Sequence, residues 1–202
     1  MTRHNLKHEV QDYSRKFASI EEIDRDFKAS ARTSIHRSRT SAPLRILLNQ
    51  GLITGSVLNF GKGKCSIDSE SIIAESEGQN CTDYDYTYCR TNIFGSYFDS
   101  VYVGYVMNTL PPQSRDVCWK QVANATRRAT PGKSGGKAFI AVRSDRDKGI
   151  KGEPFMDGVK TSIGTFQLGY SSEMIISEAR RFFAKVTEIK GASGYKLVQC
   201  EH

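Results

Sequence analysis

The segment from residue 56 to residue 85 constrains the fold of this chain more than any other. Residues 56–60 (SVLNF) form a short apolar run that is typical of a buried strand. The run breaks at Gly61-Lys62-Gly63, and a helical pattern follows that ends at Gly78. A second strand, residues 81–85, then ends on carboxylates. A strand, a glycine turn, a helix and a strand ending in an acid predict a nucleotide-type site in an α/β fold.

The residue types at this predicted site indicate what kind of nucleotide it takes. Gly61 and Gly63 let a ligand approach the backbone, and the start of the following helix offers N–H donors. Asp83 and Asp85 lie 20 and 22 residues after Gly63, a spacing at which an acid accepts hydrogen bonds from ribose hydroxyls. Because a carboxylate binds a diol and repels a phosphate, a phosphate-free ribose ligand fits best.

Three ligand classes compete for such a turn. The dinucleotide fingerprint requires a third glycine, where this chain has Ser66. The phosphate-loop pattern is matched only at its end, Gly132-Lys133-Ser134, because Arg127 stands at its first glycine. S-adenosylmethionine (SAM) carries no phosphate and needs only the Gly-x-Gly turn, so it is the predicted cofactor. No metal is expected, because the five cysteines form no CxxC pair and no histidine cluster lies near them.

The rest of the chain predicts helices alternating with strands. Ser19 and Glu22 form a capping box for a helix over residues 20–31, and a second helix starts at Ser41 and stops at Gly51. Further elements are expected at residues 97–107 (strand), 112–130 (helix), 138–142 (strand), 171–183 (helix) and in a hairpin of residues 185–189 and 195–199. The prediction is a mostly parallel Rossmann-like sheet with an antiparallel C-terminal hairpin. Residues 1–55 are expected to form a helical cap of the same domain, and residues 56–202 the SAM-binding part.

Charge is unevenly spread along the chain. Residues 1–55 carry a net +4, residues 56–118 a net −4 and residues 119–202 a net +7. Basic surface favours polyanions, so a nucleic-acid partner is open beside the alternative of solvated lysines. No apolar run approaches the roughly 20 residues of a membrane span, so no membrane association is expected. An odd number of cysteines favours reduced thiols in a cytoplasmic protein, and nothing predicts the oligomeric state.

Four segments carry a resemblance to a known family. They are residues 32–37 (RTSIHR) with 41–45 (SAPLR), 57–64 (VLNFGKGK), 103–108 (VGYVMN) with Arg115, and 161–167 (TSIGTFQ). In these segments the chain resembles the methyltransferases associated with DNA phosphorothioation gene clusters, which have phage-borne relatives. That family lies within the class I SAM-dependent methyltransferase superfamily.

The resemblance implies roles for individual residues. Gly61 and Gly63 would lie against the methionine part of SAM, and Asp85 or Asp83 would hold the ribose. Asp85 is favoured because Tyr84-Asp85-Tyr86 better fits the Tyr-Asp-Pro pattern of the family at this strand end. Tyr105 and Asn108 would face the sulfonium and the methyl acceptor.

One further candidate comes from the residues themselves. His36 stands among basic residues, where it would contact phosphate or act as a base, or simply lie in a surface loop. Asn108 is not followed directly by two prolines and an aromatic residue, so methylation of an exocyclic amine is not predicted.

The chain departs from the family in three places. Asn59 stands where most members have an aspartate that orients the amino group of the methionine part, and Cys65 stands where a third glycine is usual. Residues 85–97 are too few for the usual third strand and its helix, so we expect a trimmed sheet. These departures leave two hypotheses, a SAM-dependent methyltransferase and a non-catalytic binding module that keeps the fold. A dinucleotide-dependent oxidoreductase is a third.

Overall fold

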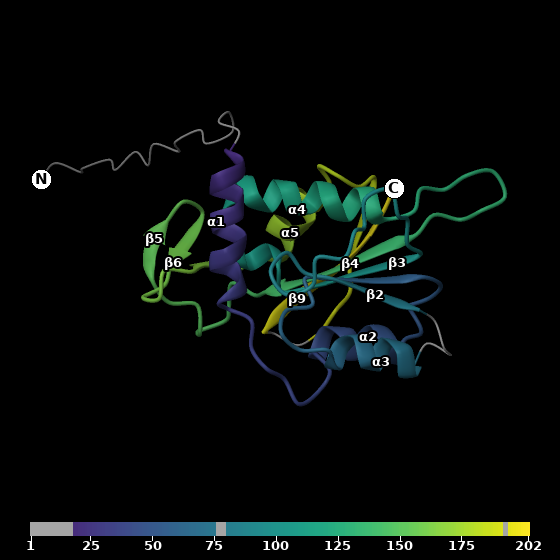
Figure 1. Ribbon diagram of the computed structural model, residues 1–202, viewed down its shortest axis with the longest axis horizontal. Coiled ribbons are helices and arrows are strands. Elements are labelled where there is room, and N and C mark those ends of the chain that lie inside the picture. The colour runs from purple at the N-terminus through teal and green to yellow at the C-terminus, as the bar shows by residue number, and fades with distance from the viewer. Residues whose placement is uncertain (1–17, 76–79, 192–193) are drawn as a thin grey trace, which may run out of the picture.

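The computed structural model describes residues 18–75, 80–191 and 194–202, and its elements form two sheets with helices around them (Figure 1). The larger sheet contains β1 (Val57–Phe60), β2 (Cys81–Tyr84), β3 (Ser100–Gly104), β4 (Lys137–Arg143), β8 (Lys185–Glu188) and β9 (Tyr195–Glu201). The smaller sheet contains β5 (Glu153–Phe155), β6 (Gly158–Lys160) and β7 (Phe166–Gln167). The helices are α1 (Ile20–Ala31), α2 (Ala42–Asn49), α3 (Ile67–Glu75), η1 (Met107–Thr109, a 3₁₀ turn), α4 (Pro112–Ala125) and α5 (Ser172–Ala179). The first 17 residues of the predicted cap lie outside the described residues.

The larger sheet has the strand order β2-β1-β3-β4-β9-β8. Strands β2, β1, β3 and β4 pair in parallel, and β9 is antiparallel to both of its neighbours, β4 and β8. This topology confirms the predicted mostly parallel sheet with an antiparallel C-terminal hairpin. The antiparallel strand is internal, however, and β8 forms the edge.

Strand β2 forms the opposite edge of the sheet. Residues 85–99, all of them described, form turns and isolated bridges instead of a further strand and helix. The sheet is therefore trimmed where the short spacing predicts it.

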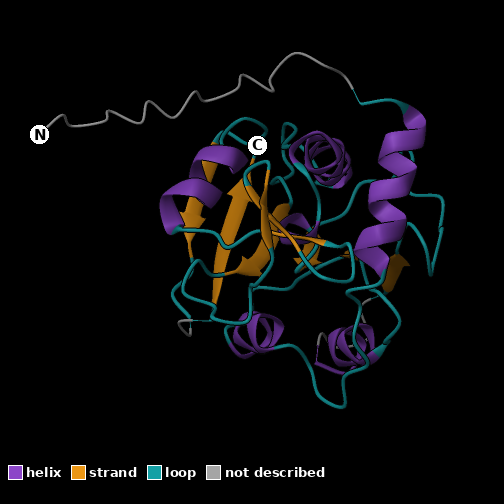
Figure 2. Ribbon diagram, turned by 90° about the vertical axis from the view of Figure 1, so that its left-hand side faces the viewer, coloured by secondary structure: helices purple, strands orange, loops and turns teal. Residues whose placement is uncertain are grey.

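Helices α4 and α5 cover one face of this sheet and α2 and α3 the other (Figure 1), and an apolar core lies on each face. Successive strand residues point to opposite faces, so Leu58 packs in the core that includes Trp119 of α4, while Val57 packs in the core that includes Leu44 of α2. Trp119 is fully buried. Helix α1 contributes Phe27 to the core that includes Trp119 and stands upright at the right of Figure 2.

The helix termini follow their local chemistry. Ser19 and Glu22 form the predicted capping box of α1, and Pro43 lies in the first turn of α2. The prediction for α4 is wrong at its end, because the helix stops at Ala125 and not near residue 130. Thr126 is extended there, and the Phe98 N–H donates to the Ala125 carbonyl at 2.8 Å. The predicted end of α3 at Gly78 lies outside the described residues.

The smaller sheet was not predicted, because strands of two or three residues are too short to show a periodicity. It is attached to the larger unit through Arg115 of α4, which is almost completely buried. The Arg115 guanidinium pairs with Asp157, in the β5–β6 turn, and with Glu178 of α5 at 2.7 Å. Glu178 also accepts hydrogen bonds from the Trp119 indole and the Tyr170 hydroxyl. This ionic cluster fixes the β5–β7 segment against α4 and α5.

Among the described residues, no helix is long and apolar enough to cross a membrane. All five cysteines lie in the described part and are free thiols. Burial raises the pKa of the Cys118 and Cys200 thiols well above the usual value, which keeps both protonated.

Candidate functional site

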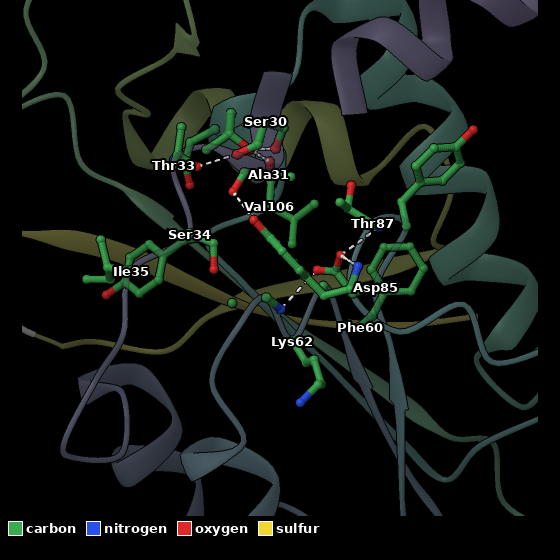
Figure 3. Close-up of a pocket in the computed structure, with 18 of the residues that line it drawn as sticks. Ser30, Ala31, Thr33, Ser34, Ile35, Phe60, Lys62, Asp85, Thr87 and Val106 are labelled. Carbon is green, nitrogen blue, oxygen red and sulfur yellow. Dashed lines mark hydrogen bonds between the residues drawn. The ribbon is translucent and has the colours of Figure 1, made fainter. Parts of the chain in front are cut away.

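A cavity of about 480 Å³ opens at the carboxyl ends of the parallel strands. Each of these strands contributes to its wall at or just after its last residue: Gly61 after β1, Asp85 after β2, Tyr105 after β3 and Arg143 at the end of β4. In open α/β sheets this is where ligands bind. Figure 3 shows the part of the cavity that the glycine turn and the N-terminal segment line.

The glycine turn needs its glycines for steric reasons. Gly61 and Gly63 have φ values of 75° and 66°, a region that strongly favours glycine. A Cβ atom on Gly61 would lie 2.1 Å from Cγ2 of Val106, and one on Gly63 would lie 2.4 Å from Oγ of Ser34. The chain therefore passes this turn with no room for side chains, and the open space beyond it belongs to the cavity.

The N–H groups of this turn already have partners within the protein. The Gly61 N–H donates to the Tyr84 carbonyl at 2.7 Å, and the Gly63 N–H donates to Oδ2 of Asp85 at 2.9 Å. The Lys64 N–H donates to Oγ of Ser34 at 3.0 Å. The turn is thus held in shape by β2 on one side and by the N-terminal segment on the other.

The two candidate ribose carboxylates lie in different surroundings. Asp85 lines the cavity, and its Oδ1 accepts hydrogen bonds from the N–H groups of Thr87 and Tyr88 (Figure 3). These bonds fix the carboxylate in one orientation. Asp83 is not among the lining residues and accepts a hydrogen bond from the Ser69 hydroxyl of α3 instead. Of the two, Asp85 is the one that the structure brings to the cavity.

Asn59, predicted as a cofactor residue, is buried and does not line the cavity. It lies beside Asp83 in the β1–β2 register, and its amide nitrogen donates to Oδ1 of Asp83 at 3.3 Å and to Oγ of Ser69 at 2.9 Å. An aspartate at position 59 would place a second carboxylate against Asp83, and like charges at that separation repel. The asparagine, which departs from the family pattern, is therefore the residue that fits this environment.

Tyr105 and Asn108, the two residues expected to face the sulfonium and the acceptor, both line the cavity. Tyr105 has a φ of 62°, which is rare for a residue with a side chain and is a kind of strain that clusters at functional sites. Burial raises the pKa of its phenol to about 12, and the Arg37 guanidinium lies 5.5 Å from its ring centre. Asn108 is buried in η1, where its Oδ1 accepts a hydrogen bond from the Arg143 N–H at 3.3 Å.

His36 lies in a different position from the other candidates. Its side chain is exposed, and it is not among the lining residues, although its neighbours Ile35 and Arg37 are. His36 therefore lies in a surface loop beside the cavity, and its role as a phosphate contact or base stays a prediction.

Arg143, Asp147 and Gln167 line the cavity and bond one another, and they are among the lining residues for which the sequence predicts no role. Nε of Arg143 donates to Asp147 at 2.8 Å, and its Nη1 donates to Oε1 of Gln167 at 3.2 Å. The hydrogen bond from Arg143 lowers the pKa of Asp147 below its usual value. The sequence does contain a signal for Arg143, because this residue ends a buried strand, and the carboxyl ends of parallel strands lie at the same edge of a sheet. Gln167 was part of the segment that resembles the family but had no assigned role.

The N-terminal segment covers the glycine side of the cavity. The hydroxyl of Tyr88 donates to the Ala31 carbonyl at 3.0 Å, and the hydroxyls of Ser30 and Thr109 are 2.6 Å apart. The rings of Phe27 and Tyr86 pack with their centres 4.6 Å apart. Helix α1 and the chain that follows it therefore form one wall of the site, as Figure 3 shows for residues 30–35.

These features define a class of protein before any comparison is made. The structure has a doubly wound sheet with a glycine turn after its first strand and a carboxylate after its second, and both line one cavity. This is the layout of nucleoside-binding α/β proteins of the Rossmann type. No three histidine, cysteine or acidic residues come together as a metal site anywhere in the described part of the chain.

Comparison with known proteins narrows the class of fold. No protein-family model matches the chain, and no curated protein sequence matches it. Among solved structures, the chain is similar to the Burkholderia thailandensis 1,6-didemethyltoxoflavin N1-methyltransferase with bound 1,6-didemethyltoxoflavin and S-adenosylhomocysteine (SAH). That match has a TM-score of 0.59 at 14% identity and covers 92% of this chain and 91% of the other.

Two further solved structures give the same result. The complex of DhpI with SAM and HEP matches with a TM-score of 0.58 at 14% identity, over 79% of this chain and 84% of the other. An O-methyltransferase family protein from Burkholderia thailandensis matches with a TM-score of 0.57 at 12% identity, over 78% of this chain and 54% of the other. The fold of this chain is therefore the Rossmann-like fold of the class I SAM-dependent methyltransferases.

Proposed function

We propose that this protein is a SAM-dependent methyltransferase. The observation that carries the proposal is the cavity in which the Gly61–Gly63 turn and the Asp85 carboxylate form one wall, while Tyr105 and Asn108 line the same space. Solved structures of the same fold contain SAM or SAH. When bound, SAM supplies an electrophilic methyl group on a sulfonium.

The residues present fit this cofactor. Asp85 offers a fixed carboxylate to a ribose diol, while the turn offers close approach to backbone rather than free N–H donors. Among the described residues, Lys62 is the only lysine that lines the cavity. Its ammonium donates to Oγ of Ser66 at 2.8 Å and points away from the labelled cavity residues (Figure 3). A phosphate at this wall would face the Asp85 carboxylate, while the Lys62 ammonium is already engaged by Ser66 and lies 3.8 Å from Oδ2 of Asp83, which disfavours a dinucleotide.

The side chains of Tyr105 and Asp147 in the cavity indicate the protonation state in which the methyl acceptor must bind. Tyr105 stays protonated because burial raises its pKa to about 12, and Asp147 stays ionised because Arg143 lowers its pKa. Neither group has a pKa near neutral pH, as an efficient general base would have. The site therefore suits an acceptor atom that already carries a free lone pair, and the residues act by positioning it.

Calorimetric titration of the protein with SAM and with SAH tests the proposal. We expect saturable binding to the wild type and at least tenfold weaker binding to D85N, because a neutral amide binds the ribose diol less strongly than a carboxylate does. D83N is the matched control, since Asp83 does not line the cavity. If D85N and the wild type bind SAM and SAH with equal affinity, Asp85 is not the residue that binds the ribose. If the folded protein gives no binding heat at millimolar ligand, the proposed function is wrong.

A non-catalytic module with the same fold is the alternative, and it was motivated by Asn59 and Cys65. Transfer of labelled methyl groups from SAM to small-molecule, nucleic-acid and protein fractions separates the two, because a binding module labels none of them. Asn59 has a structural reason in its bond to Asp83, which supports the catalytic reading.

Finer assignments rest on the sequence and are part of this proposal. The four resembling segments support membership of the phosphorothioation-associated family with its phage-borne relatives, and the free cysteines support a cytoplasmic location. Residues 1–55 are proposed as a cap, of which residues 27–37 contribute to the cavity wall. A nucleic-acid acceptor stays a prediction of the charge distribution, and the same labelling experiment tests it.

A further inference from the structure

The acceptor end of the cavity has hydrogen-bond donors that the protein does not use. The orientation of the Asn108 amide is determined by its partner, because the Arg143 backbone N–H can only donate and so must face Oδ1. The Nδ2 group then points elsewhere, and no described residue accepts its hydrogens. The same reasoning applies to Gln167, whose Oε1 faces the Arg143 guanidinium, a group that also only donates. Its Nε2 likewise has no described acceptor.

These amide nitrogens open onto the cavity. Gln121 Oε1 is the one fully enclosed side-chain oxygen or nitrogen atom in the described residues that has no partner. Asn108 Nδ2 and Gln167 Nε2 are therefore not enclosed, although both residues are buried at 1% and 6% exposure and both line the cavity. A ligand in this space meets two amide donors whose direction is fixed by the surrounding protein.

Two guanidinium groups add positive charge at the same end. Arg143 uses Nε and Nη1 to bond Asp147 and Gln167, and its Nη2 has no described acceptor. Arg37 approaches from the N-terminal segment and lies over the Tyr105 ring, with only a long 3.4 Å contact from Nη1 to Asp68. The one carboxylate at this end, Asp147, already accepts from Arg143 and from the Gly149 N–H. Donors are thus in excess, and the acidic group is already engaged.

We propose that the methyl acceptor is a small molecule carrying an oxyanion, such as a carboxylate or a phosphonate, that binds to Asn108, Arg143 and Gln167. An oxyanion accepts several hydrogen bonds at once, and bonds between charged groups are stronger than neutral ones. The donors line a cavity of about 480 Å³, which is within the usual size range for small-molecule sites, so a compact molecule fits it more readily than a polynucleotide does. This inference rests on the proposed function, since it names the substrate class of the same site.

The test measures probe binding by calorimetry to the free protein and to the protein with SAH. The probes are phenylacetate and benzylphosphonate, with phenylacetamide as the neutral counterpart and a mixed-sequence single-stranded oligonucleotide as the polyanion. We expect at least one oxyanion probe to bind about tenfold more tightly than phenylacetamide. The ratio between the carboxylate and phosphonate affinities identifies which oxyanion the site prefers.

Two variants that should change the affinity for the oxyanion probes in opposite directions separate a direct role in oxyanion binding from a structural effect. R143Q should remove the preference for the oxyanion, whereas D147N should strengthen oxyanion binding about threefold, because it removes the negative charge that offsets Arg143. A variant that only disturbed the structure would weaken binding in both cases. R128Q changes an exposed arginine away from the cavity and should leave all affinities unchanged.

The outcomes distinguish this inference from the proposed function. The inference is overturned if phenylacetate and phenylacetamide bind equally well, or if D147N binds the oxyanion probes more weakly than the wild type does. It is also overturned if neither oxyanion probe binds at a concentration on the order of 10 mM. A preference for the oligonucleotide over both small oxyanions also overturns it. Failure of SAH to bind while the oxyanion preference persists on the free protein contradicts the proposed function alone.

Discussion

The two halves of the cavity, the proposed cofactor half and the proposed acceptor half, are built in opposite ways. In the cofactor half, the N–H groups of the glycine turn and the Asp85 carboxylate already bond one another or their neighbours. In the acceptor half, Asn108 and Gln167 both line the cavity, and the amide nitrogen of each has no acceptor among the described residues. The first half is preformed by its own hydrogen bonds, while the second keeps hydrogen-bonding capacity for a ligand. Preorganisation therefore lies on the cofactor side and selectivity on the acceptor side.

The substitution G61A should have the largest effect and should break the cofactor half alone. It adds a Cβ 2.1 Å from Val106 at a φ of 75°, so we expect loss of measurable SAH binding and a free energy of unfolding lowered by about 3 kcal/mol. G51A is a matched control, because Gly51 has a φ of 61° with no atom within 4 Å of the added Cβ. G51A should cost only about 1 kcal/mol in urea unfolding and leave SAH affinity unchanged. Equal effects of the two variants would refute a steric role for Gly61.

How far each half can be predicted from sequence follows from this difference. The glycine turn and Asp85 lie within residues 57–85, a continuous stretch in which α3 and β2 separate them, and the N-terminal segment adds a further wall. The acceptor half joins Asn108, Arg143 and Gln167, which come from three separate segments. Their meeting depends on strand order and on the three-residue strands β5 and β6, and neither leaves a periodic signal in the sequence. Even within residues 57–85, the sequence does not explain why an asparagine stands at position 59. The reason appears only when the strand register places Asn59 beside Asp83.

The substitution R115M should affect the acceptor half through the fold. It leaves Asp157 unpaired and removes the cation that faces the Glu178 carboxylate, so we expect a loss of about 3 kcal/mol in the free energy of unfolding. Because Asp157 belongs to the segment that continues to Gln167, oxyanion binding should weaken while SAH affinity in the folded protein stays the same. Denaturant unfolding and calorimetry at a temperature where the variant is folded measure both. A matching loss of SAH affinity would show that the two halves are not independent.

The substitution S34A tests how firmly the N-terminal segment closes the cofactor half. It removes the hydroxyl that accepts from the Lys64 N–H at 3.0 Å, which should lower stability by about 1 kcal/mol. The freed N–H is near the cavity, so SAH affinity should change by less than about threefold. S38A alters an exposed serine of the same segment and serves as the control in thermal unfolding and calorimetry. A tenfold loss of affinity in S34A would mean that Ser34 contacts the cofactor.

The smallest effect is expected at Tyr105, where the two halves meet. Burial raises its folded-state pKa to about 12, above the usual value near 10, so the neutral phenol stabilises the fold. That stability is fully present below pH 10 and is lost as the pH rises through 12. In an absorbance titration, Y105F should therefore lack one phenol that ionises late in the wild type, and the rest of the titration curve should not change. Removal of an early-ionising phenol would contradict the buried setting of Tyr105.

A crystal structure of the protein with SAH tests the central claim most directly, because it shows both halves at once. We expect the ribose hydroxyls on the Asp85 carboxylate, the amino-acid part of SAH against Gly61 and Gly63, and the sulfur facing the side of the cavity that carries Tyr105 and Asn108. The free amides of Asn108 and Gln167 should remain uncovered by the cofactor. A ribose bound at Asp83, or SAH lying across Asn108 and Gln167, would contradict the account.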